Sequence, residues 1–367
     1  MEQEKKLYPF RFCTLKDEYG WGVEEFKLAD LGYRDSLVAD GWLAGNSIGE
    51  IMDMYMDRVV GENVFNRYGR QFPFEVKLLR VKGRTPLMVH PDDETASQRY
   101  DFLGKEKLWY VVSAGRDARL MIGFRKDTDA SEVYEKCIDN TIDGIMNVIA
   151  PIEGQSFHIP PGTPHSACGD IVIAEISESS PLDFCMCGWG EEVSTDEFDE
   201  SLNLVDALDF INYAQFKGDG GAHDHHHHHE GSLLHKLTDL PQFTVHKLDL
   251  RDPLHTYSGQ FDSPVCYICI KGEASVQVKL SEELGNVPYV IKEGETLMVP
   301  AEVPDYIIAP LQTGTTLLET IVEKREEEDP YINPDAPASL DDDGSDCCDE
   351  DDDDCCCNEH HHHHHES

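Results

Sequence analysis

The stretch that decides the fold runs Gly154-Gln155-Ser156-Phe157-His158-Ile159-Pro160-Pro161-Gly162-Thr163-Pro164-His165. A turn glycine opens it, a short apolar strand follows, and a Pro-Pro-Gly turn closes it. A similar arrangement recurs 140 residues later as Gly294-Glu295-Thr296-Leu297-Met298-Val299-Pro300. We therefore expect one hairpin geometry to occur twice, in two β domains that follow one another along the chain.

Short apolar strands separated by Gly and Pro surround both stretches. Their pattern predicts strands at residues 74–81, 108–113, 171–176, 243–248, 264–270, 274–280 and 315–322. Two capping boxes, Ser47-x-x-Glu50 and Ser194-x-x-Glu197, each precede a helical apolar pattern. The sequence thus predicts a mainly β fold of sandwiches or jelly-roll barrels with inserted helices.

Charge and composition exclude several classes of partner. The 367 residues include 72 Asp and Glu against 30 Lys and Arg, a net charge of −42. Such an acidic chain is expected to bind neither nucleic acid nor membranes. No apolar run is long enough to span a bilayer, and the first residues do not resemble a secretory signal. We therefore expect a cytoplasmic protein whose cysteines are thiols or metal ligands.

The spacing Gly154-x5-Pro160-x-Gly162-x2-His165 is similar to the second sequence motif of the cupin superfamily, whose histidine is a metal ligand. Neighbouring segments resemble class I mannose-6-phosphate isomerases from about Tyr8 to Val322. They are Val38-Ala39-Asp40-Gly41 with Ala44-Gly45, Phe72-Pro73-Phe74-Glu75-Val76-Lys77, Val89-His90-Pro91-Asp92-Asp93-Glu94, Gly104-Lys105 followed by Trp109-Tyr110, and Ala174-Glu175-Ile176.

This resemblance implies tandem cupin barrels, that is, double-stranded β-helix or jelly-roll barrels, with inserted helices. The expected divisions are a catalytic-type barrel at 1–193, a helical segment at 194–217, a His-rich linker at 218–232, a second barrel at 233–328 and an acidic disordered tail at 329–367. In the second barrel, Asp305 stands where a metal histidine would fall. The Cys266-x-x-Cys269 pair lies in an apolar strand, so we expect both thiols in the core.

The family interconverts mannose 6-phosphate and fructose 6-phosphate, and its divalent metal, usually zinc, is held by Gln, Glu and two His. The resemblance carries the two histidines over to His90 and His165. The glutamine position is Met88, and the glutamate position is Lys107. An arginine that lines the family's substrate site is replaced by Cys185.

These substitutions leave three interpretations of the pocket open. In the first, the Lys107 ammonium replaces the metal among neutral imidazoles, with Lys107 and Lys77 as candidate catalytic residues. In the second, Met88, His90, His165 and Cys185, with Cys187 as a further candidate, form a soft site for copper or zinc. In the third, apolar side chains fill the pocket and it binds nothing.

The C-terminal region concentrates thiols, carboxylates and imidazoles. Its candidate ligands for transition metals are Cys347, Cys348, Cys355, Cys356, Cys357, His360, His361 and His362. Alternatively, the final His run is an expression tag and the acids only raise solubility. The function expected from the whole sequence is a mannose-6-phosphate isomerase with weakened or lost activity. The alternative is a non-catalytic bicupin that binds a sugar phosphate or, through its tail, metal ions.

Overall fold

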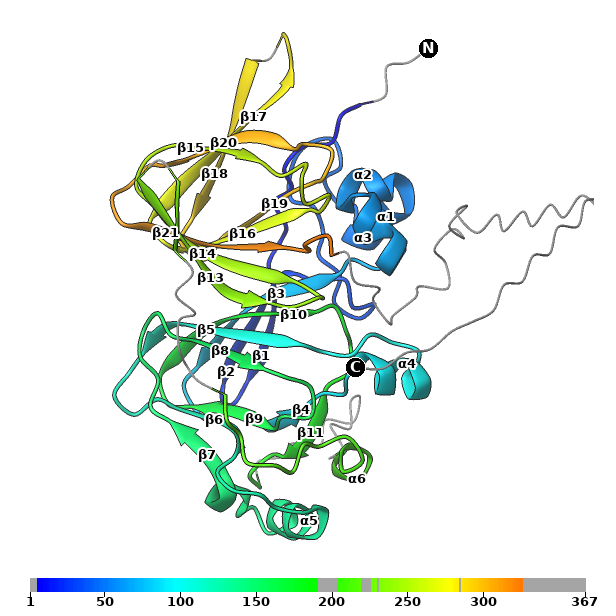
Figure 1. Cartoon of the computed structure of the whole chain (residues 1–367), viewed down its shortest axis with the longest axis vertical. Helices are drawn as coiled ribbons and strands as arrows, with labels where there is room; N and C mark the ends of the chain where they lie inside the picture. Colours follow the sequence, from blue (N-terminus) through cyan, green and yellow to red (C-terminus); the bar gives the residue numbers. More distant parts are fainter. Residues whose placement is uncertain (1–4, 191–202, 219–225, 230, 284, 326–367) are drawn as a thin grey trace, which may run out of the picture. The chain divides into compact units, whose positions relative to one another are not determined.

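The computed structural model describes residues 5–190, 203–218, 226–229, 231–283 and 285–325 (Figure 1). In this part of the chain the named strands form four sheets, and the pairings between them are antiparallel. The mainly β fold predicted from the sequence is confirmed. None of the described helices is long and apolar enough to cross a membrane.

Two sheets from the first half of the chain enclose one core. The six-stranded sheet has the order β1 (Leu15–Tyr19), β2 (Gly22–Leu28), β3 (Phe74–Val81), β10 (Ile171–Glu178), β5 (Lys107–Ala114) and β8 (Ser156–Ile159). The facing sheet has the order β11 (Phe184–Cys187), β4 (Leu87–Val89), β9 (His165–Cys168), β6 (Arg119–Phe124) and β7 (Met146–Ile149). Val81 and Ile173 of the first sheet pack with Leu120 and Ile122 of the second.

The second half repeats this topology. Its larger sheet has the order β12 (His226–His229), β13 (Ser232–Asp239), β14 (Thr244–Leu250), β21 (Thr315–Ile321), β16 (Val265–Lys271) and β19 (Thr296–Val299). Its smaller sheet has the order β15 (Leu254–Tyr257), β20 (Asp305–Pro310), β17 (Glu273–Ser281) and β18 (Gly285–Lys292). Residues from both sheets, such as Tyr267 and Ile308, share a core. We call the two halves the first and second sandwich.

The sequence repeat at Gly154 and Gly294 is a structural repeat. Both glycines adopt a left-handed backbone, with φ of +88° and +81°. Gly154 N donates to the Val111 carbonyl at 2.9 Å, and Gly294 N donates to the Cys269 carbonyl at 2.8 Å. Each glycine leads into the edge strand of its larger sheet, β8 in the first sandwich and β19 in the second. The predicted recurrence of one hairpin geometry is confirmed.

The larger sheets of the two sandwiches contribute to one shared core. Because side chains alternate along a strand, β3 presents Leu78 to this shared core and Leu79 to its own sandwich. Cys266 likewise belongs to the shared core, whereas Cys269 belongs to the second sandwich. The prediction that these two cysteines are core thiols on opposite faces of one strand is confirmed.

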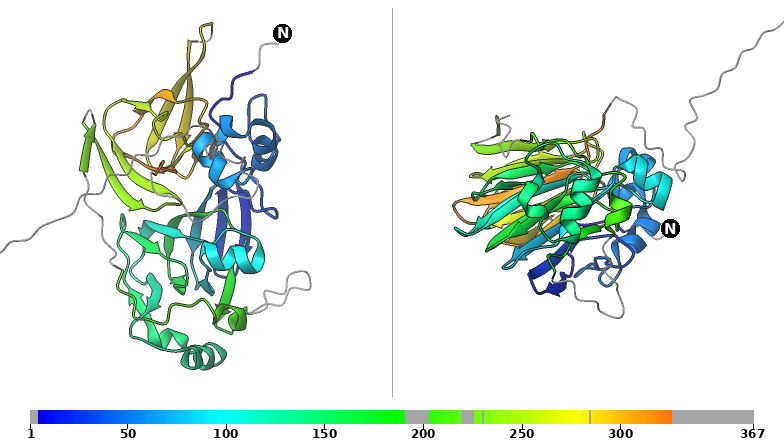
Figure 2. Two further views of the ribbon diagram at one scale, coloured as in Figure 1. Left: turned by 45° about the vertical axis from the view of Figure 1, so that its right-hand side comes forward. Right: turned by 90° about the horizontal axis from the view of Figure 1, so that it is seen from below.

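Helices cover one side of the shared core (Figure 2). They are α1 (Ile48–Tyr55), α2 (Asp57–Val60) and α3 (Glu62–Tyr68). The predicted capping box begins α1: the Ser47 side chain accepts from the Glu50 backbone, and the Glu50 carboxylate accepts from the Ser47 backbone. The other helices are α4 (Asp93–Tyr100), α5 (Ala130–Ile138), the 3₁₀ helix η1 (Ile142–Ile145) and α6 (Leu204–Ala207).

Two sequence predictions meet the structure only in part. The expected His-rich linker contains strand β12, whose residues His226–His229 pair with β13. Backbone pairing with an existing sheet edge overrides the low strand propensity of such a segment. The capping box at Ser194 and the tail lie outside the described residues, and the division boundaries stay predictions.

Candidate functional site

The inner face of the first sandwich carries charged side chains in two rows that cross the larger sheet. In one row, Glu175 on β10 pairs with Lys77 on β3 and with Trp109 on β5. In the next row, Ser177 on β10 lies between Glu75 and Lys107. Two residues along a strand place side chains on the same face, so both rows point into the sandwich.

The facing sheet supplies the two histidines predicted from the sequence. His90 directly follows β4, and His165 begins β9 after the Pro-Pro-Gly turn. Their ring centroids lie 5.1 Å apart, and both side chains are buried. Segments that are distant in the sequence thus bring the two imidazoles together, while their role as metal ligands stays a prediction.

The amino group of Lys107 lies between the two imidazoles. Its Nζ is 3.0 Å from Nε2 of His90 and 3.3 Å from Nε2 of His165. The third neighbour is Oε2 of Glu175, at 3.2 Å. The same Glu175 oxygen accepts from the Trp109 indole N–H at 2.6 Å. Lys107 is thus at the centre of three acceptors, one on β9, one on β10 and one directly after β4.

Hydrogen bonding fixes the protonation of this centre. Nδ1 of His165 lies 2.9 Å from the Thr163 carbonyl, and Nδ1 of His90 lies 3.0 Å from the Leu182 carbonyl. A carbonyl only accepts, so both Nδ1 atoms carry the proton and both Nε2 atoms are acceptors. Lys107 must therefore donate to two imidazoles and one carboxylate, which uses the three N–H bonds of an ammonium.

The pKa shifts agree with neutral imidazoles beside a charged pair. Burial, reinforced by the Lys107 ammonium, lowers the pKa of His165 to about 3, and the same causes lower the pKa of His90 well below its usual value. Burial opposes ionisation of Glu175, but the neighbouring lysines lower its pKa to about 2. Burial also lowers the pKa of Lys107, while the Glu175 carboxylate opposes that shift.

A second network of ion pairs adjoins the first. Lys105 Nζ lies 2.7 Å from Oε1 of Glu75 and 3.4 Å from Oδ1 of Asp183. Asp183 also lies 3.2 Å from Nδ1 of His90. Lys77 Nζ contacts Glu24 at 2.9 Å and Glu75 at 3.6 Å. Lys77, named from the sequence as a candidate catalytic residue, is thus a buried member of a charge network.

The side chains present do not fit a zinc ion at this position. Zinc requires about 2.0–2.1 Å to each imidazole nitrogen, and the Lys107 ammonium already lies against both Nε2 atoms. A zinc ion there would lie in contact with the Lys107 ammonium, and the two positive charges would repel each other. Within the described ranges, no cluster of three or more His, Cys, Asp and Glu could hold a metal ion.

Three residues of the soft-metal interpretation lie in one row of the smaller sheet. Met88 pairs with His165 on β9 and with Cys185 on β11. They share a region, but Lys107 already engages both Nε2 atoms. The soft site therefore stays a prediction, as does the tail site, whose residues lie outside the described part of the chain.

Sequence reasoning did not name several members of the site. Glu175 stands as a charged residue within the apolar strand Ile173-Ala174-Glu175-Ile176, and this pattern could have marked it as an inward-facing charge. Asp183 lies outside the strands, so strand periodicity could not have placed it.

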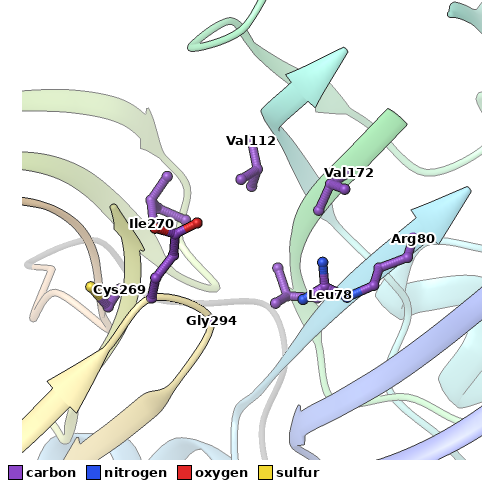
Figure 3. A pocket seen from close by; sticks show the side chains of 8 residues that line it. Leu78, Arg80, Val112, Val172, Cys269, Ile270 and Gly294 are labelled. Atoms are coloured by element: carbon purple, nitrogen blue, oxygen red, sulfur yellow. The ribbon is translucent and has the colours of Figure 1, made fainter. Parts of the chain in front are cut away.

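A separate cavity of about 150 Å³ lies between the larger sheets of the two sandwiches (Figure 3). Leu78, Arg80 and Val112 line it from the first sandwich, and Cys269 and Ile270 line it from the second. Leu78 and Lys77 point to opposite faces of β3, so this cavity does not belong to the Lys107 site.

Comparison with known proteins finds sequence similarity to proteins named mannose-6-phosphate isomerases. The mannose-6-phosphate isomerase ManA of Bacillus subtilis is 23% identical over 313 residues, which cover 80% of this chain and 93% of ManA. The mannose-6-phosphate isomerase of Streptococcus mutans is 23% identical over 230 residues, which cover 62% of this chain and 68% of that protein. The chain is a distant relative of the mannose-6-phosphate isomerases.

The fold agrees with that relationship. The crystal structure of the mannose 6-phosphate isomerase from B. subtilis superposes with a TM-score of 0.73 at 20% identity, covering 85% of this chain and 99% of that one. A phosphomannose isomerase mutant from Salmonella typhimurium gives a TM-score of 0.64 at 14% identity, with 86% and 100% covered. No protein-family model matches the chain.

Proposed function

We propose that this protein is a metal-free, carbohydrate-binding relative of the mannose-6-phosphate isomerases that does not interconvert aldose and ketose. The observation that carries the proposal is the Lys107 ammonium, which occupies the space between the His90 and His165 Nε2 atoms. In this proposal Lys107 provides the central positive charge that a metal provides in the isomerases. The sugar class of the ligand follows from the isomerases to which the chain is related.

The contacts of Lys107 disfavour turnover. Moving a proton between C1 and C2 of a sugar needs an electrophile on the carbonyl and a base near the carbon. All three Lys107 N–H bonds point at protein acceptors. His90, His165 and Glu175 are themselves at most 3% exposed in the structure. None of these groups is therefore open to a reacting sugar in this arrangement.

Metal analysis of matched variants tests the proposal. The full chain and its His90→Ala variant are purified together, exchanged against a weak chelator, and compared for zinc per chain and for mannose 6-phosphate turnover. We expect equal zinc in both samples, because the tail is common to both, and no turnover even with added zinc. One zinc fewer in the variant, together with turnover by the parent, would refute the proposal.

A second pair of variants tests whether Lys107 is the cause. Replacing Met88 by Gln and Lys107 by Glu places the family's two missing ligand types beside the histidines. We expect this double variant to hold one more zinc per chain than the parent. Adding His90→Ala should remove that extra ion, and circular dichroism should show that all variants remain folded.

A further inference from the structure

We infer that the site around Lys107 selects sugars without a phosphate group and, among those, favours a sugar that carries an amino group. This inference rests on the proposed function for the site and names the chemistry of its ligand. It departs from the phosphorylated substrates for which the related isomerases are named.

The lysines of the site are all paired with protein carboxylates. Lys105 has Glu75 and Asp183 as ionic partners and also donates to the Ser180 carbonyl at 2.9 Å. Lys77 has Glu24 and Glu75 within 3.6 Å, and Lys107 has Glu175 at 3.2 Å. A phosphate dianion is normally bound by cations or N–H groups that have no competing anion. None of these three lysines meets that condition.

Other basic residues of the first sandwich are paired as well. Arg34, whose guanidinium lies over the Tyr33 ring, is held by Asp17 at 2.7 Å. On the face of β2 and β3 opposite the site, Glu25 accepts from Arg80 at 3.0 Å and lies 3.1 Å from Lys27. A phosphorylated sugar would therefore have to break an existing ion pair in order to gain a cation.

The charged groups that reach solvent from the site are carboxylates. The side chains of Asp183 and Glu24 are 33% and 18% exposed, whereas those of Lys77 and Lys105 are at most 2% exposed. The network has three cations against four carboxylates, and its imidazoles are neutral, so its net charge is −1. Its members are Lys77, Lys105, Lys107, Glu24, Glu75, Glu175 and Asp183. This charge repels a dianion and attracts an ammonium group.

Two further observations point to a ligand at this place. Oε2 of Glu75 is buried and has no hydrogen-bond partner in the described structure, so one acceptor of the network lacks a donor. Tyr33 is 47% exposed, so part of its ring is open to a sugar. Burial and, after it, the charge of the Asp183 carboxylate raise the pKa of the Tyr33 hydroxyl to about 12, so the charge of the site reaches this residue.

Calorimetric titration of the full chain tests the inference with three probes: mannosamine, mannose and mannose 6-phosphate. At about pH 6.5 and low salt the amine is protonated. We expect mannosamine to bind about tenfold more tightly than mannose, since the network carries a net negative charge and its exposed members are the carboxylates of Asp183 and Glu24. Mannose 6-phosphate should bind more weakly than mannose.

Variants locate the effect. Asp183→Asn and Glu24→Gln should each weaken mannosamine binding about threefold more than they weaken mannose binding, the size of a partly exposed ion pair. Asp305→Asn is the matched control, because Asp305 begins β20 as His165 begins β9, and its partner is His255 at 2.6 Å. This control should change neither the mannosamine affinity nor the mannose affinity. A loss of mannosamine affinity in the control would show that the amine binds elsewhere on this acidic chain.

Three outcomes would overturn the inference: mannose 6-phosphate binding at least as tightly as mannose, mannosamine binding that neither site variant weakens, or no binding of any probe. The first would leave the proposed metal-free function standing, because metal content and turnover test that function separately. If Asp183→Asn does not fold, Glu24→Gln decides the result alone, since Glu24 lies at the edge of the network.

Discussion

At the scale of single residues, the pairing of Lys107 with Glu175 has a consequence for stability. Replacing Lys107 by Met leaves a buried carboxylate with only Trp109 at 2.6 Å and Lys77 at 3.9 Å to stabilise its charge. Breaking a buried pair by removing one partner costs about 3–5 kcal/mol. We expect urea unfolding to show a loss of about 3 kcal/mol for Lys107→Met.

The double variant Lys107→Met, Glu175→Gln is the control for that prediction. It removes the unpaired charge as well as its partner, so it should recover at least about 1 kcal/mol of the loss. Unfolding of Lys107→Met at the parent's urea midpoint would contradict the buried ion pair.

Asp30 gives a prediction about pH. Burial, with the nearby carboxylates of Asp35 and Asp53, raises the pKa of Asp30 to about 6, and only the Phe72 N–H opposes the shift. A raised carboxyl pKa means that the folded chain binds a proton more tightly than the unfolded chain. Ionisation of Asp30 therefore lowers the free energy of unfolding. This loss grows as the pH rises from about 4 to about 6 and stays constant above pH 6.

Asp30→Asn removes that loss while keeping an oxygen that can accept from the Phe72 N–H. We expect the variant to be about 1–2 kcal/mol more stable than the parent at pH 7 and no more stable at pH 4. Asp53→Asn, at a carboxylate whose side chain is 59% exposed, should change stability little at either pH. A gain by Asp30→Asn that is equal at both pH values would contradict the raised pKa.

At the scale of elements, the Pro-Pro-Gly turn that presents His165 depends on a close backbone approach. Gly162 has φ of +78°, and a Cβ there would lie 2.6 Å from the Phe210 carbonyl oxygen. Gly154 has a similar φ of +88°, but a Cβ there would meet no atom closer than 3.9 Å. The two glycines thus share a left-handed backbone and differ in the space around them.

Alanine at each position separates the two effects. Gly154→Ala should cost about 1–2 kcal/mol in thermal unfolding, the price of a left-handed non-glycine residue. Gly162→Ala should cost about 2 kcal/mol more than that, because the 204–213 segment must shift as well. Equal losses would show that the backbone contact with Phe210 does not constrain the turn.

The elements could largely be predicted from sequence, whereas the site could be predicted only in part. Alternating apolar residues marked β3 and β10, the Gly-Pro spacing located His165, and the family resemblance located His90. The substitution at Lys107 suggested a cation in the metal position. What it does there depends on Glu175 across the sheet and on Asp183 in a loop. Strand periodicity cannot determine loop positions, because loops lack a fixed repeat.

At the scale of the whole molecule, the two sandwiches share apolar residues. Phe10 donates to and accepts from Met298 of the second sandwich, at 2.8 and 3.0 Å. Arg58 on α2 pairs with Glu302 at 2.7 Å. Leu78 of β3 and Leu318 of β21 lie in one buried cluster with α1–α3. A cluster with members in both sandwiches should couple their unfolding, since neither sandwich can lose its strands without exposing that surface.

The tryptophans make this coupling measurable. All four, Trp21, Trp42, Trp109 and Trp189, come before the second sandwich, which begins with β12. Ile308→Ala creates a cavity in the core enclosed by the two sheets of the second sandwich, which should cost about 2–5 kcal/mol. If the sandwiches unfold as one unit, the tryptophan fluorescence midpoint in urea falls with the far-UV circular dichroism midpoint, although no tryptophan is near the change. Leu318→Ala, in the shared core, should lower both midpoints in the same way.

A different result would mean that the first sandwich folds independently. In that case Ile308→Ala would leave the tryptophan fluorescence midpoint unchanged and would split the circular dichroism transition into two. The site around Lys107 would then depend only on the first sandwich.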